Sequence, residues 1–154
     1  MIICSSMAVE IDQSGRVEDL STGTAVAFSN KQQGSLFISA GAKRKLISYL
    51  RRNSLIPVSD LPAVIFGILL YMLISDYKID NLRIDEEYTG KNLIIEETIE
   101  KLFIGHAPAR ILTIRFMRIG KKSRAHILAW QVHRSKGRGK EVKKVSETDI
   151  LKLI

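Results

Sequence analysis

The chain has 154 residues, of which 45% are apolar and 26% are charged, a balance typical of one folded domain and unlike that of a disordered chain. Its single cysteine, Cys4, excludes an internal disulfide framework and a zinc site built on clustered cysteines. The start of the chain lacks the basic leader of a secretory signal. We therefore expect one cytoplasmic domain over residues 1–154, with residues 1–6 as a frayed extension.

The net charge of +8 is concentrated in one segment. Residues 115–144 hold eleven lysines and arginines and one acid, Glu141, so this segment carries +10 and the rest of the chain −2. Such a localised field favours nucleic acid as a partner over an anionic membrane surface, although a basic face that only maintains solubility is the simpler interpretation. The predicted nucleic-acid contacts are Lys121, Lys122, Arg124, Arg134, Lys136 and Arg138.

Strand patterns come first along the chain, and strands then alternate with helices. Turn residues and polar stretches separate these patterns, and residues 135–144 are expected to form a basic loop. This order predicts an α/β domain with a mixed sheet and helices on both faces. The predicted elements are strands 7–12, 22–28 and 35–39, helices 42–52 and 60–75, strand 82–85, helix 91–103, strand 111–119, helix 122–134 and a short helix that begins at a capping box formed by Ser146 and Asp149.

The apolar run over residues 61–74, LPAVIFGILLYMLI, resembles a membrane segment in composition. It has 14 residues, whereas a membrane-spanning helix needs about 20. We therefore expect a buried core helix and no membrane contact. An oligomer contact through this helix is the alternative, which makes a dimer possible.

Two aspartates end predicted strands. Asp12 closes the apolar part of the first strand, and Asp85 ends the fourth strand and is followed by Glu86 and Glu87. Neighbouring strands lie about 4.8 Å apart, so two carboxylates at adjacent strand ends can share divalent cations. The ordinary alternative is that these acids only end strands and cap the turns that follow.

The helix predicted over residues 122–134 carries a third candidate, His126. On a helix, His126, Trp130 and His133 share one face, which is more often a half-buried helix face than a ligand set. Lys121 and Lys122 stand at the helix start, where the helix dipole also favours anions. The pattern indicates a phosphate group near this end of the helix.

The order of elements and three short motifs together resemble the ribonuclease H-like superfamily. The motifs are IDQSG around Asp12, IDEEYTG around Asp85 and KKSRAHILA around His126. The resemblance covers residues 7–135 and implies a five-stranded mixed sheet in the order β-β-β-α-β-α-β-α, with the second strand antiparallel. A histidine in the last motif is similar to the Piwi and Argonaute branch, whereas classical ribonucleases H carry aspartate there. The helix over residues 60–75 is an addition to that pattern.

The resemblance implies a metal-dependent nuclease in which Asp12, Asp85 and His126 bind Mg²⁺ or Mn²⁺. Many members use a further glutamate, and we assign a catalytic role to Glu87. Two alternatives remain open: a non-catalytic nucleic-acid-binding or assembly module on the same fold, and a protein-interaction domain whose basic face binds an acidic partner. The candidates for the additional glutamate are Glu10, Glu86 and Glu87.

Overall fold

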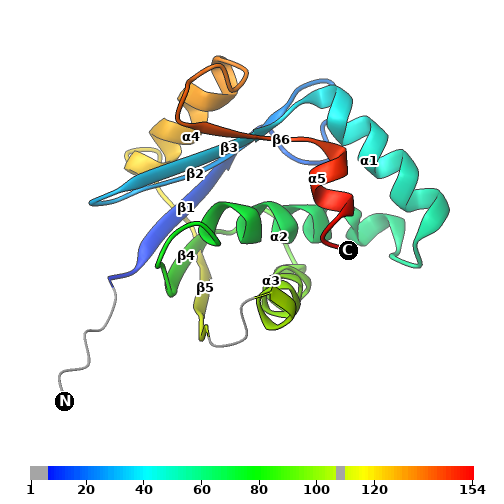
Figure 1. Ribbon diagram of the computed structural model, residues 1–154. Helices are drawn as coiled ribbons and strands as arrows, with labels where there is room; N and C mark the ends of the chain where they lie inside the picture. The colour runs from blue at the N-terminus through cyan, green and yellow to red at the C-terminus, as the bar shows by residue number, and fades with distance from the viewer. Residues whose placement is uncertain (1–6, 107–109) are drawn as a thin grey trace.

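The computed structural model describes residues 7–106 and 110–154, so the predicted frayed extension over residues 1–6 lies outside the described residues. Within them the chain forms a mixed six-stranded sheet with helices on both faces (Figure 1). The α/β prediction is confirmed, and the expectation of five strands is wrong by one. The elements are β1 (Val9–Ser14), β2 (Thr24–Ser29), β3 (Gln33–Ile38), α1 (Ala40–Asn53), the 3₁₀ turn η1 (Val58–Asp60), α2 (Leu61–Ile74), β4 (Asn81–Asp85), α3 (Asn92–His106), β5 (Thr113–Met117), α4 (Arg124–Arg134), β6 (Val142–Val145) and α5 (Glu147–Leu151).

The strands follow the spatial order β5-β4-β1-β2-β3-β6. β2 is antiparallel to both of its neighbours, while β4 is parallel to β1 and β5, and β6 is parallel to β3. Because β1 and β4 are adjacent and parallel, their carboxyl ends meet at one edge of the sheet. This pairing places Asp12, the fourth residue of β1, beside Asp85, the last residue of β4.

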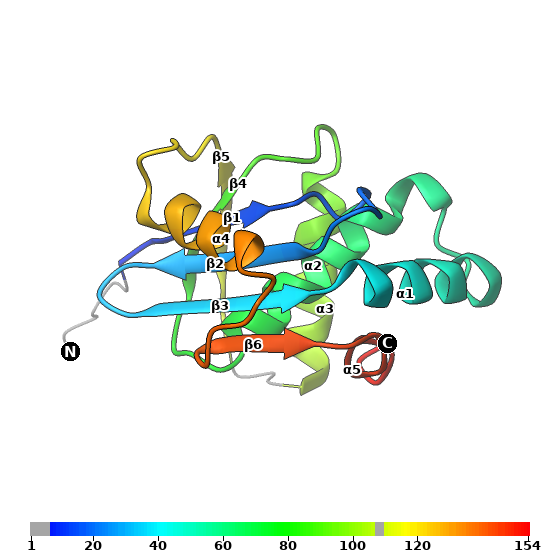
Figure 2. The same ribbon diagram turned by 90° about the horizontal axis from the view of Figure 1, so that it is seen from above.

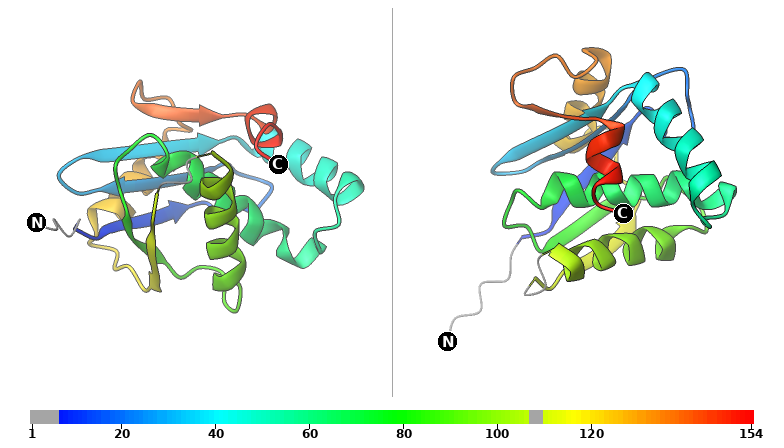
Figure 3. Two further views of the ribbon diagram at one scale, coloured as in Figure 1. Left: turned by 60° about the horizontal axis from the view of Figure 1, so that its bottom comes forward. Right: turned by 45° about the vertical axis from the view of Figure 1, so that its right-hand side comes forward.

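The helices lie in layers on the two faces of the sheet. α4 packs on β1, β2 and β3 on one face, and α2 covers the other face (Figures 1 and 2). α3 packs against α2, and α5 packs against α1 beyond the edge of the sheet (Figure 3). On the α4 side of the sheet, β4 and β5 lie next to the strands that α4 covers. Their surface adjoins Asp12 and Asp85.

α2 is the core helix that the sequence predicted. Twelve of its 14 residues are buried, so most of the helix belongs to the core. α3 approaches α2 closely at Gly67, where an added Cβ would lie 2.8 Å from the Cβ of Thr98. No helix in the described ranges is long and apolar enough to cross a membrane.

The basic loop predicted over residues 135–144 is wrong at its C-terminal end, because Val142–Val145 form β6 beside β3. The chain turns from α4 toward this strand through left-handed Lys136 and Gly137, and an added Cβ at Gly137 would lie 2.7 Å from the ring of Phe37. β6 is an edge strand, so it tolerates exposed lysines. The predicted capping box then opens α5.

Candidate metal centre

Three carboxylates converge where β1 and β4 end. Asp12, Asp85 and Glu87 each offer one oxygen, and these oxygens all lie within 4.8 Å of one another. Asp12 is in β1 and only 2% exposed, Asp85 is the last residue of β4, and Glu87 follows in the loop after β4. Oxygen ligands at this spacing suit a hard divalent cation, so the group could bind a metal ion.

Hydrogen bonds orient the two aspartates. The backbone N–H of Gln13 donates to Oδ1 of Asp12 over 2.8 Å, and Nδ1 of His126 lies 2.7 Å from Oδ2 of the same carboxylate. The backbone N–H of Ile119, between β5 and α4, donates to Oδ1 of Asp85 over 2.7 Å. Each carboxylate is therefore held in one direction before any ligand arrives.

Arg16 holds the third carboxylate in place. Its Nη2 donates to the backbone carbonyl of Glu87 over 2.9 Å, and its Nη1 lies 3.5 Å from the Glu87 carboxylate. The guanidinium also lies over the ring of Tyr88, 5.0 Å from its centroid, and the Tyr88 hydroxyl accepts from the N–H of Val17 over 3.1 Å. The loops after β1 and β4 are thus tied together. Arg16 directly follows the IDQSG motif, and its role was not predicted from the sequence.

The cluster is electrostatically unfavourable on its own. Burial raises the pKa of Asp12, the hydrogen bond from His126 opposes that rise, and the charge of Asp85 adds to it. Burial, with the hydrogen bond and charge of Asp85 and the charge of Asp12, raises the pKa of Glu87 to about 7. A divalent cation between the carboxylates would relieve both burial and repulsion.

The carboxylates face a cleft of about 490 Å³. Its walls combine the acids with basic groups: Arg118 and Lys121, from the segment between β5 and α4, line the cleft together with His126. An acidic floor beneath a basic rim can bind a cation and a phosphate group side by side.

The predicted helical face does not form one ligand set. His126 contacts Asp12 and lines the cleft, but it lies outside the group of three mutually close carboxylates. Trp130 is 47% exposed on the outer side of α4. His133 is hydrogen-bonded through Nε2 to the hydroxyl of Thr22 over 2.9 Å. Only His126 of this face therefore reaches the cleft.

The other two glutamates considered for the site lie beside the cluster. Oε1 of Glu10, in β1, accepts a hydrogen bond from the hydroxyl of Ser123 over 3.2 Å, at the start of α4. Glu86 is exposed and lines the cleft, and its backbone N–H donates to the carbonyl of Met117 over 3.0 Å. Glu87 is thus the glutamate that joins the two aspartates.

The six basic residues expected to contact nucleic acid separate into two groups along α4. Its 11 residues span about 16 Å. At the far end the guanidinium of Arg134 lies over the ring of Trp130, 5.1 Å from its centroid. The cleft end carries Lys121, Lys122 and Arg124, and the far end carries Arg134, Lys136 and Arg138.

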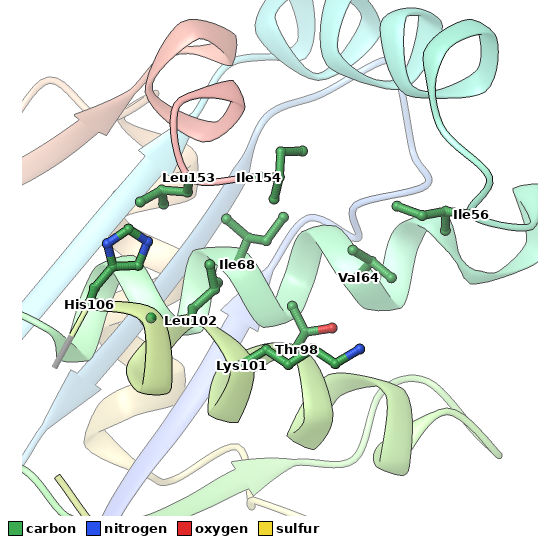
Figure 4. Close-up of a pocket in the computed structure, with 10 residues that line it drawn as sticks. Ile56, Val64, Ile68, Thr98, Lys101, Leu102, His106, Leu153 and Ile154 are labelled. Atoms are coloured by element: carbon green, nitrogen blue, oxygen red, sulfur yellow. The ribbon is translucent and has the colours of Figure 1, made fainter. Parts of the chain in front are cut away.

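A second cavity, of about 450 Å³, is of a different kind (Figure 4). Leu153 and Ile154 at the C-terminal end line one side, opposite Ile68 of α2 and Leu102 of α3. Its lining is largely aliphatic, so it offers no set of metal ligands.

Comparisons of the chain with protein-family models, with curated proteins and with solved structures find no match.

Proposed function

We propose that the protein is a divalent-metal-dependent nuclease that hydrolyses phosphodiester bonds in DNA, RNA or a hybrid of the two. The observation that carries the proposal is the convergence of carboxylate oxygens from Asp12, Asp85 and Glu87 within 4.8 Å. Two of the three motifs that resemble ribonuclease H-like proteins supply these acids, and the third supplies His126. A mixed sheet with an antiparallel second strand also supports that fold, to which β6 would be an addition.

The three carboxylates would bind Mg²⁺ or Mn²⁺, both of which prefer oxygen ligands. A bound cation stabilises the negative charge that develops on the phosphate oxygens. In the hydrolysis the oxygen of a water molecule bonds to phosphorus and the bond to one ester oxygen breaks, which leaves a phosphate monoester and an alcohol. The chain's own groups position the reactants: His126 orients Asp12, while Arg118 and Lys121 attract the phosphate to the cleft.

Cleavage assays on DNA, RNA and hybrid substrates of one sequence test the proposal. Wild-type protein should cleave at least one substrate with Mn²⁺ or Mg²⁺, and both a chelator and Asp12→Asn should abolish the cleavage. Glu97→Gln, which removes an exposed acid on α3, is the matched control and should remain active.

Absence of cleavage by clean wild-type protein with either metal would refute the nuclease proposal. Salt-sensitive binding that needs no metal and survives Asp12→Asn, without cleavage, would instead favour the non-catalytic nucleic-acid-binding module.

A further inference from the structure

Two arginines stand side by side on the sheet next to the acidic cluster. Arg83 of β4 and Arg115 of β5 are register partners on adjacent parallel strands, and both side chains are exposed. Strands in a sheet lie about 4.8 Å apart, and register partners point to the same face. Arg83 is two residues before Asp85 in β4, so both arginines lie on the face that carries the cluster.

Within the described part of the chain, neither guanidinium group forms a direct contact with an acidic side chain. Among residues 7–106 and 110–154, Arg83 and Arg115 take part in no hydrogen bond and no ion pair. Glu10, the register partner of Arg83 on β1, accepts its hydrogen bond from Ser123 instead. Like charges directly opposite each other destabilise a sheet, so this pair costs stability unless an anion lies between the two groups.

The position of the pair matches a repeating anion. Two residues along a strand cover about 6.6 Å, which is close to the spacing of consecutive phosphates along a nucleic acid strand. Guanidinium groups bind phosphate oxygens through paired, charge-assisted hydrogen bonds. α4 packs on β1, β2 and β3 and leaves the two arginines of β4 and β5 exposed. A nucleic acid that extends from the cleft toward β5 could therefore reach both of them.

We propose that Arg83 and Arg115 together bind the phosphate adjacent to the one that occupies the carboxylate cluster. The proposal rests on the proposed nuclease function and makes the substrate a polynucleotide, because a diester with a single phosphate cannot reach both places. It also gives the path of the bound nucleic acid, which runs from the cleft across β4 to β5.

The experiment measures how salt weakens the binding of a fluorescent oligonucleotide, as single-stranded DNA, single-stranded RNA and hybrid duplex, in the presence of chelator to prevent cleavage. The slope of log Kd against log salt falls by about 0.7 for each phosphate that the protein no longer neutralises on a single strand, and by about 0.9 on a duplex. If both arginines bind one phosphate, Arg83→Gln with Arg115→Gln removes one such step, and each single variant removes part of it, because the remaining guanidinium still faces the phosphate.

Arg51→Gln with Arg52→Gln is the matched control, since it removes two exposed arginines from the last turn of α1, at the other end of the molecule from β5 (Figure 1). The control should keep the wild-type slope. A second readout is hydrolysis of bis(p-nitrophenyl) phosphate, a diester with a single phosphate, with Mn²⁺. The Arg83 and Arg115 variants should raise KM for the oligonucleotide by a larger factor than KM for this small diester, and the Arg51 and Arg52 control should change neither.

Equal slopes for wild type and the double variant overturn the proposal, as does an equal reduction of the slope in the Arg51 and Arg52 control. Should the double variant not fold, Arg83→Gln alone decides the question by the same criterion. If the variants lower the salt slope as predicted but wild type cleaves nothing, the phosphate subsite stands and the nuclease proposal is refuted. If wild type cleaves but the variants leave the slope unchanged, the nuclease proposal stands and the subsite is refuted. No binding of any nucleic acid by wild type, together with retention of an acidic protein, overturns both.

Discussion

Asp85→Asn should make the metal-free protein more stable and the metal-loaded protein less stable than wild type. Asp85 lies with Asp12 and Glu87 in a group whose oxygens are within 4.8 Å of one another. Asparagine has nearly the same shape and keeps an oxygen that can accept from the N–H of Ile119. The substitution therefore removes one charge from the cluster and weakens the hydrogen bond between residue 85 and Glu87.

The expected size follows from the spacing of the charges. Two unit charges 4.8 Å apart repel by about 3 kcal/mol at an effective dielectric constant of about 20. Burial and its acidic neighbours raise the pKa of Glu87 to about 7, so near neutral pH this group is partly protonated and part of the repulsion is already relieved. The hydrogen bond to Ile119 also weakens when its acceptor loses charge, by about 1 kcal/mol. We therefore expect a net gain of about 1 to 2 kcal/mol without metal.

Urea unfolding at pH 7, with chelator and with Mn²⁺, measures both effects. A ligand at 100 times its Kd stabilises the folded state by about 2.7 kcal/mol, so wild type should gain about this much from saturating Mn²⁺ and Asp85→Asn much less. The order of stability of the two proteins should then reverse. Equal gains from Mn²⁺ in the two proteins, or a variant less stable than wild type in chelator, would refute the reasoning. Glu97→Gln on α3 is the control for removal of an acid elsewhere.

Three further predictions concern single side chains. Desolvation lowers the pKa of buried Lys43 to about 8, below its unfolded value of 10.5. Burial of the charged ammonium therefore destabilises the fold below pH 8, and this destabilisation fades as the pH rises to 10.5. Over that range the unfolding free energy of wild type should rise by up to about 3 kcal/mol relative to Lys43→Met. A flat difference between the two proteins would contradict this. Gly67→Ala should lower stability by about 1 to 3 kcal/mol in thermal unfolding, because the new Cβ would press on Thr98; Gly105→Ala, which has open space, should not. His126→Ala should weaken Mn²⁺ binding roughly 10- to 100-fold in a calorimetric titration, since it removes the hydrogen bond that orients Asp12; unchanged affinity would exclude that role.

The elements with strong periodicity could be predicted from the sequence. α2 has an apolar run of the right length for a core helix, and α4 (Arg124–Arg134) lies within the helix predicted over residues 122–134. β6 could not be predicted, because Val142–Val145 place two exposed lysines between valines and resemble the basic loop before them. Only its pairing with β3 makes this segment a strand.

The candidate site was predictable as far as it depends on strand ends. Asp12 ends the apolar part of β1 and Asp85 ends β4, and the parallel pairing of the two strands then brings them together. Glu87 and Arg16 depend on loop conformation, which short motifs do not specify. The pairing of Arg83 with Arg115 depends on the register of two strands 32 positions apart, and no local pattern in the chain determines it.

The most direct test of the account is a titration of the metal-free protein with Mn²⁺, followed by the electron paramagnetic resonance of the free ion. Wild type should bind Mn²⁺ saturably, and Asp12→Asn combined with Asp85→Asn should abolish that binding while the protein remains folded. Equal binding by the two proteins, or no binding by wild type, would contradict a metal centre at the meeting point of β1 and β4.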